Sequence, residues 1–291
     1  MHLDERALTF RCGEEALYGI LSAPAEPCAR GVLIVVGGPQ YRVGSHRQFT
    51  LLARALADNG IAAMRFDYRG MGDSGGDMRR FDTVDDDLRA AIDAFMAARP
   101  DLREVVLWGL CDAASAVTMY AARDARVKGL VLLNPWVRTA DGLARTTLRH
   151  YYRERLRDRS FWRQVIRGQL DYTRSFKSMV KLARVAFGPG AAAAPASAAA
   201  AVAAEVPRGS LPDRMHAGMR DFGGRVMVII SGGDLTGREF CDLAGATSKW
   251  KRLLDSPRVT RRQIDKADHT FSRRVWRDQV AAWTCEWVRS W

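Results

Sequence analysis

The hydrophobic and polar positions of this chain follow two periods in turn, and their order predicts alternating strands and helices. Short continuous apolar runs are typical of strands covered on both faces, and longer stretches with apolar residues three or four positions apart are typical of amphipathic helices. The predicted strands are 7–12, 17–23, 31–36, 61–67, 104–109, 127–135, 225–234 and 259–265. The predicted helices are 46–60, closed by Gly60, then 83–100, 112–123, 238–254 and 275–291.

This order predicts an α/β fold with a mostly parallel sheet flanked by helices. The first two strands are joined by the short segment 13–16, which favours an antiparallel pair at one edge of the sheet. The strand–helix order breaks after Trp136 and returns only near the end of the chain. We therefore expect one core formed by residues 1–136 and 221–291, with an inserted helical cap at residues 137–220.

The predicted cap is strongly basic. Residues 137–220 contain sixteen Arg and Lys against six Asp and Glu, so this segment carries +10 of the net charge of +12. Within it, residues 188–210 consist mostly of Ala, Pro and Gly and are predicted to form a mobile loop. A localised basic patch fits an anionic substrate or peripheral contact with an acidic membrane surface. No nucleic-acid-binding motif accompanies the charge, so we expect no nucleic-acid partner.

Composition and cysteine usage fit an intracellular globular protein. The 291 residues are 47% hydrophobic and 27% charged, and no apolar run is long enough to cross a bilayer. The opening sequence MHLDERALTF lacks the apolar core of a secretory signal, so we expect a cytoplasmic location. The five cysteines are scattered without Cys-x-x-Cys spacing, which argues against a disulfide framework or a zinc site, and we expect neither metal nor cofactor.

Cys111 is the cysteine whose local sequence favours reactivity. The sequence Gly-Leu-Cys-Asp-Ala joins a predicted strand to a predicted helix, and Gly109 and Ala113 supply the small residues that a nucleophile elbow needs on either side of its reactive side chain. The amides at the start of the helix favour a thiolate at Cys111, whereas the carboxylate of Asp112 opposes it, and the sequence leaves this balance open. A buried structural thiol is the alternative for Cys111.

A nucleophile at the elbow needs a general base and an acid that orients the base, and in this kind of fold they follow in the order nucleophile, acid, histidine. His269 follows the last predicted strand and Asp234 ends the strand before it, so both would lie with Cys111 at the carboxyl edge of the sheet. The rival residues are His150 and His216 in the cap, and Asp265 and Asp268, which lie too close to His269 in sequence to hold its ring well.

The oxyanion hole is predicted at the backbone amides of Gly38 and Asp112. Asp112 follows the nucleophile, and Gly38 lies in the glycine-rich loop after strand 31–36, where the backbone can approach a developing oxyanion. Capping or packing at the start of a helix is an alternative role for His46, one of the residues expected in the substrate pocket. The expected pocket residues are Gln40, His46, Tyr151, Tyr152 and Trp162.

Five motifs, GGP, FDYRGMGDSGG, GLCDA, SGGD and DHTF, occur in the order and spacing of the α/β-hydrolase fold, and this resemblance covers nearly all of the chain outside the cap. The segments VVGGPQYRVGSHRQFTLLARALA, RFDYRGMGDS, LWGLCDAASA and LNPWVRT resemble the hydrolase 1 proteins associated with the exosortase A system, which are found with bacterial exopolysaccharide and protein-sorting genes. The cysteine at the elbow also resembles dienelactone hydrolase, at the nucleophile alone.

These residues predict a cysteine-dependent hydrolase of an ester or a thioester. His269 would deprotonate Cys111, Asp234 would orient His269, and water would release the acyl group from the enzyme. The substrate would be a small-molecule or carrier-bound acyl compound, and the resemblance implies a link to bacterial exopolysaccharide or exosortase systems. Two alternatives stay open: an acyltransferase that uses the same acyl-enzyme, and a non-catalytic binding or assembly component on the same fold.

Overall fold

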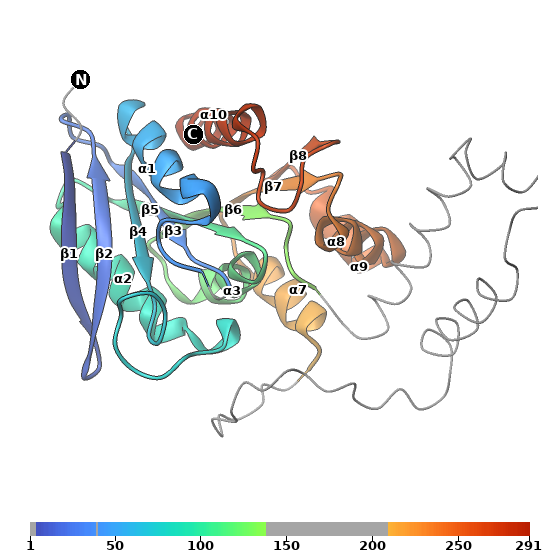
Figure 1. Cartoon of the computed structure of the whole chain (residues 1–291). Coiled ribbons are helices and arrows are strands. Elements are labelled where there is room, and N and C mark those ends of the chain that lie inside the picture. The colour runs from blue at the N-terminus through green and yellow to red at the C-terminus, as the bar shows by residue number, and fades with distance from the viewer. Residues whose placement is uncertain (1–3, 39, 138–208) are drawn as a thin grey trace, which may run out of the picture. The chain divides into compact units, whose positions relative to one another are not determined.

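A sheet of eight strands runs through the part of the chain that the computed structural model describes, residues 4–38, 40–137 and 209–291 (Figure 1). The strands are β1 (Asp4–Cys12), β2 (Glu15–Ala23), β3 (Arg30–Val35), β4 (Ala62–Asp67), β5 (Glu104–Leu110), β6 (Val127–Leu133), β7 (Arg225–Ser231) and β8 (Val259–Ile264). Their order across the sheet is β1-β2-β4-β3-β5-β6-β7-β8. β2 pairs antiparallel with β1 and β4, and the other pairs are parallel, which confirms the predicted α/β fold and its antiparallel edge.

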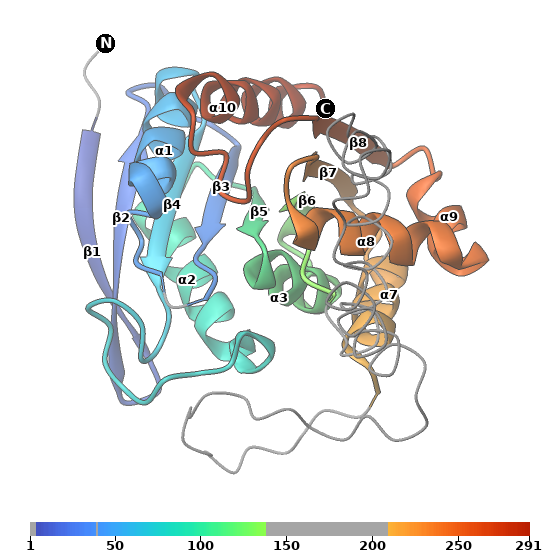
Figure 2. The ribbon, with the colours of Figure 1, turned by 45° about the vertical axis from the view of Figure 1, so that its right-hand side comes forward.

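Helices cover both faces of this sheet (Figures 1 and 2). Side chains alternate between the two faces along each strand. Val32 and Ile34 of β3 belong to the core under α1 (Gln48–Asp58) and α10 (Arg274–Arg289). On the other face, a Cβ atom on Gly31 would lie 2.6 Å from the Phe95 ring, so α2 packs closely there. The remaining helices are α2 (Asp85–Ala98), α3 (Asp112–Tyr120), α7 (Leu211–Asp221), α8 (Leu235–Ala246) and α9 (Ser248–Leu254).

The first helix begins two residues later than the sequence pattern predicts. His46 and Arg47 have φ of 52° and 59°, so they form a tight turn in front of α1 and are not part of the helix. The other end of the helix agrees with the prediction. Gly60 has φ of 77°, a left-handed conformation that ends the helix and that a residue with a side chain would adopt only with strain.

The predicted helix 238–254 is two helices. Thr247 has extended backbone angles, φ −123° and ψ 130°, and separates α8 from α9. α8 also begins earlier than predicted, because Asp234 caps its N-terminus and accepts a hydrogen bond from the amide of Gly237. As the N-cap residue of α8, Asp234 has its carboxylate just beyond the carboxyl end of β7.

The core resumes earlier after the insertion than residue 221. One compact unit comprises Met1–Val137 and Pro212–Trp291, so α7 belongs to the core and not to the cap. The apolar side chains of Met215 and Met219 are buried, and a Cβ atom on Gly218 would lie 2.4 Å from the Thr118 carbonyl oxygen of α3. The sequence of this segment is basic and has few apolar residues, so its short buried face was not predicted. Residues 138–208 of the predicted cap lie outside the described residues, and they include all but the last two residues of the loop expected at 188–210.

Candidate active site

A sharp turn between β5 and α3 carries Cys111. β5 ends at Leu110 and α3 begins at Asp112, so Cys111 alone forms the connection, with φ 62° and ψ −123°. Such angles are strained for a residue with a side chain and persist only where the surroundings enforce them. Here a Cβ atom on Gly109 would lie 2.7 Å from the carbonyl carbon of Ala113, so strand and helix are in close contact. This is the geometry of a nucleophile elbow.

The end of β6 holds the elbow in place. The amide of Cys111 donates to the Leu133 carbonyl at 2.9 Å, and the Cys111 carbonyl accepts from the amide of Trp136 at 3.1 Å. The hydroxyl of Ser115 in α3 donates to the Trp136 carbonyl at 2.6 Å. Both backbone groups of the strained residue are therefore bonded, the amide to the last residue of β6 and the carbonyl to the segment that follows it.

The structure brings Asp234 and His269 to the same edge of the sheet as Cys111. The Oδ2 atom of Asp234 accepts from the Gly237 amide at 3.0 Å and lies 2.9 Å from Nδ1 of His269, in the loop after β8. The thiol of Cys111 is a second hydrogen-bonding partner of the His269 ring. The three side chains form a continuous series from thiol to imidazole to carboxylate, which is the arrangement that the sequence predicts.

The charges in this series stabilise one another. Hydrogen bonds to Asp234 and Cys111 raise the pKa of His269 from 6.5 to about 10, although burial of the ring opposes the shift. Burial raises the pKa of Asp234, but the hydrogen bond and charge of His269 outweigh it and leave this pKa below its ordinary value. At neutral pH His269 therefore carries a proton and Asp234 is ionised.

The rival residues have other partners. Asp268 accepts from the backbone amide of Ser272 at 2.9 Å and also from its hydroxyl, so both of its carboxylate oxygens are bonded to Ser272. Asp265 accepts from the side chain of Gln263 at 2.7 Å. His216 of α7 packs edge-on against the ring of Trp250, and His150 lies outside the described residues.

One of the two amides predicted for an oxyanion hole, that of Gly38, is bonded to the carboxylate of Asp112. The Gly38 amide donates to Oδ2 at 2.8 Å, and the Ala113 amide donates to Oδ1 at 2.9 Å. In this conformation the Gly38 amide is bonded to Asp112, and its role as an oxyanion donor stays a prediction.

A buried ion pair fixes the loop that carries Gly38. The backbone amide of Arg42 donates to the fully buried carboxylate of Asp67 at 2.7 Å, and the Arg42 guanidinium pairs with the same carboxylate. The guanidinium also pairs with Asp73 at 2.7 Å, where the hydroxyl of Tyr41 donates at 2.8 Å. The loop after β3 is thus bonded to the turn after β4, which defines the position of Gly38 relative to the elbow.

The structure describes two of the five expected pocket residues. Gln40 follows the glycine loop, and its side-chain Oε1 atom is buried with no hydrogen-bond partner among the described residues. His46 is exposed in the turn before α1. The expected residues Tyr151, Tyr152 and Trp162 lie outside the described residues. Within the described ranges, no cluster of His, Cys, Asp or Glu is placed to hold a metal ion.

Asn134 links the loops of the site, and the sequence analysis gave it no role. It directly follows β6, is fully buried and has φ of 42°. Its side-chain nitrogen donates to the Ser231 hydroxyl at 2.9 Å and to the His269 carbonyl at 3.0 Å, while its side-chain oxygen accepts from the Ser231 amide at 2.8 Å. Asn134 therefore joins the strand end before Asp234 to the loop of His269. The available signal was an amide side chain directly after the apolar run of residues 130–133.

Replacing Asn134 with alanine is expected to lower the free energy of unfolding by about 2–5 kcal/mol, because the buried Ser231 amide and His269 carbonyl would lose their partners. Urea unfolding measures this loss. The variant Asn134→Gly is the control for the backbone, since glycine adopts positive φ without strain. A glycine variant as stable as the natural protein would show that the side-chain bonds contribute nothing.

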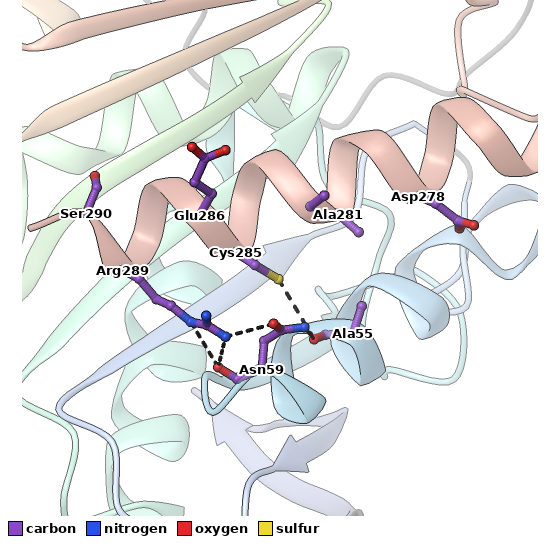
Figure 3. A pocket seen from close by; sticks show the side chains of 9 residues that line it. Ala55, Asn59, Asp278, Ala281, Cys285, Glu286, Arg289 and Ser290 are labelled. Carbon is purple, nitrogen blue, oxygen red and sulfur yellow. Dashed lines mark hydrogen bonds between the residues drawn. The ribbon is translucent and has the colours of Figure 1, made fainter.

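A surface pocket of about 670 Å³ lies between α1 and α10, away from these residues (Figure 3). The guanidinium of Arg289 donates to the backbone and side-chain oxygens of Asn59, each at 2.7 Å, and the thiol of Cys285 faces the Ala55 carbonyl at 3.8 Å. Burial raises the pKa of the Cys285 thiol to about 11, so this thiol stays protonated. Asn59 and Arg289 lie at the C-terminal ends of their helices, at the edge opposite the carboxyl ends of the strands.

The sheet order, the elbow at Cys111 and the acid–histidine pair after β7 and β8 define an α/β hydrolase. Residues 27–184, more than half of the chain, match the family model described as serine aminopeptidase, S33. The chain belongs to this family of α/β-hydrolase enzymes. The elbow holds Cys111 in a family whose description names serine.

Solved structures share the fold over almost the whole chain. An esterase of Pyrococcus furiosus is 14% identical with a TM-score of 0.64, over 99% of this chain and 93% of that one. The esterase domain of a Rhodothermus marinus protein is 18% identical with a TM-score of 0.60, over 98% of each chain. Dienelactone hydrolase of Anabaena variabilis is 15% identical with a TM-score of 0.58, over 99% of this chain and 97% of that one. At these identities the likeness shows the fold alone.

No curated protein matches the sequence. Among the described helices, none is both long and apolar enough to span a membrane.

Proposed function

We propose that this protein is a cysteine-dependent hydrolase of an ester or a thioester that acts through an acyl-Cys111 intermediate. The observation that carries the proposal is the series of hydrogen bonds from the thiol at the elbow through His269 to Asp234. A thiol held only for packing would need neither a strained backbone nor an imidazole bonded to a carboxylate.

The geometry supports a two-step reaction. The sulfur of Cys111 bonds to the acyl carbon while His269 holds the proton of the thiol, and the raised pKa of His269 gives that proton a stable position. The bond from the acyl carbon to the leaving oxygen or sulfur then breaks, and His269 protonates the leaving group. In the second step water bonds to the acyl carbon while His269 takes its proton, the bond from the acyl carbon to the Cys111 sulfur breaks, and this one proton is again shared by the sulfur and His269.

The substrate that we propose is an acyl compound, small or bound to a carrier and anionic in part, within a bacterial exopolysaccharide or exosortase system. The support is the resemblance of the motifs around Gly38, Cys111 and Asn134, together with the basic residues of the segment 137–220. Peripheral contact of that segment with an acidic membrane surface belongs to the same proposal. The five cysteines are free, which supports a reducing compartment such as the cytoplasm.

Mass spectrometry of the intact protein tests the intermediate. After brief incubation with p-nitrophenyl acetate or an acetyl thioester, we expect one added acetyl group, mapped to Cys111 by peptide analysis. The variant Cys241→Ala removes an exposed thiol elsewhere and should still be acetylated, whereas Cys111→Ala should not. Acetylation of Cys111→Ala at the natural rate, or none at Cys111 in the natural protein, would contradict the proposal.

A further inference from the structure

The carboxylate of Asp112 occupies the position where an acyl oxyanion would bind. Its two oxygens accept from the amides of Gly38 at 2.8 Å and Ala113 at 2.9 Å. The amides of Gly38 and Asp112 are the donors that an α/β hydrolase presents to a developing oxyanion. A carboxylate of the protein is therefore bound by one of the two donors of the hole, the Gly38 amide.

The surrounding backbone is shaped around this carboxylate. A Cβ atom on Gly37 would lie 2.2 Å from Oδ1 of Asp112 and 2.8 Å from the Leu110 carbonyl oxygen, so only a glycine leaves room for the carboxylate. Gly38 has φ of 57°, which directs its amide toward Asp112. Burial raises the pKa of Asp112, and the amides together with the charge of His269 oppose that effect. The carboxylate is thus partly withdrawn from water and held by backbone dipoles.

An acyl carbonyl and this carboxylate cannot use the same amides together. During attack by Cys111 the carbonyl oxygen becomes negative, and removal of a single donor from an oxyanion hole typically costs about 10²–10³ in rate. With Asp112 in place, the Gly38 amide is occupied and a second anion would lie beside the developing charge. The reaction must therefore proceed from a conformation in which the Asp112 side chain has moved away.

We propose that Asp112 is a resident competitor for the oxyanion hole, which fills the hole in the resting protein and controls access of the acyl carbonyl to it. This inference rests on the proposed function, because it concerns the same acyl transfer to Cys111. Substrates gain the hole only by displacing the carboxylate, so the residue determines which acyl groups react and how fast. A hole emptied of this carboxylate should accept an acyl group more readily.

A purely structural role for Asp112 predicts the opposite result. Cys111, at the N-cap of α3, makes no side-chain capping bond, so the bond from Asp112 to the Ala113 amide could serve only to stabilise the helix and the loop. Loss of a structural bond would loosen the elbow and slow the acylation of Cys111. The sign of the rate change therefore separates the two roles.

Single-turnover acetylation of Cys111 by p-nitrophenyl acetate, followed by nitrophenolate release and by intact mass, measures this sign. We expect Asp112→Ala to acylate about 10- to 100-fold faster than the natural protein, because the hole is empty. Asp112→Asn keeps the shape and one acceptor oxygen but lacks the charge, and should be faster than the natural protein by a smaller factor. The control variant is Asp86→Ala, which removes a well-exposed carboxylate from α2 and should leave the rate unchanged.

The result separates this inference from the proposed function. If both Asp112 variants are faster and thermal unfolding shows them folded, the competitor role holds. If the natural protein is acetylated at Cys111 but either Asp112 variant is equal or slower, the inference is overturned and the proposed function stands. If neither the natural protein nor Asp112→Ala is acetylated at Cys111, both are overturned.

Discussion

Replacement of Cys111 by alanine is expected to lower kcat/KM toward aryl esters and acyl thioesters by about 10⁴-fold or more. The acyl group would have no atom to which it could bond, although His269, Asp234 and the amides near Gly38 would remain. Steady-state kinetics measure the loss, and thermal unfolding shows whether the variant keeps its fold. Alanine has no bulky group to accommodate at φ 62°, so we expect the fold to persist. Comparable turnover in the two proteins would contradict the mechanism.

Serine at the same position is the informative companion to alanine. The elbow, His269 and Asp234 would all be retained, and the hydroxyl could lose its proton to the imidazole. The thiol is one cause of the raised pKa of His269, so this pKa should fall in Cys111→Ser and make the ring a better match for a general base. We expect a rate between those of the natural protein and Cys111→Ala. A serine variant no faster than alanine would show that the imidazole does not serve as a base for this position.

The fold could be predicted because its signal is local. Continuous apolar runs such as residues 31–36 give strands buried on both faces, and the glycine at position 60 marks a helix end whatever surrounds it. The boundaries that the pattern missed depend on distant contacts. α7 is buried through two methionines and a close approach of Gly218 to α3, and a basic sequence with few apolar residues gives little sign of either.

The site also contains residues that the sequence predicts and residues that it does not. The sequence predicts the proximity of Cys111, Asp234 and His269, because each follows a parallel strand of one sheet. The carboxyl ends of such strands share an edge. The direction of the Asp112 side chain depends on an amide 74 positions away in sequence, and Asn134 bonds to groups 97 and 135 positions away. Sequence spacing carries no information on such pairs, so both were seen only in the folded chain.

Replacement of Asp234 by asparagine is expected to lower kcat/KM by about 10²–10⁴-fold with little change in stability. Asparagine caps helices as well as aspartate does, so the start of α8 should be retained. The hydrogen bond and charge of Asp234 are the first cause of the raised pKa of His269, so this pKa should fall well below about 10 in the variant. The amide nitrogen of asparagine can also donate to Nδ1, which leaves the ring proton on Nε2 and removes the ring nitrogen that would act as the base.

The titration of His269, followed by NMR of its ring, checks the cause directly. In the natural protein the stabilisation that a charged His269 gives to the folded state is complete below about 6.5 and is lost as the pH rises through about 10, because the folded pKa is the higher one. In Asp234→Asn this loss should occur at lower pH. The matched control is Asp268→Asn. Asp268 precedes His269 in the sequence, but its carboxylate is bonded to Ser272, so this variant removes a nearby charge and leaves the bond from Asp234 to Nδ1. An equal fall in rate and in the pKa of His269 for both variants would show that proximity of charge, and not the bond from Asp234 to Nδ1, sets the state of the imidazole.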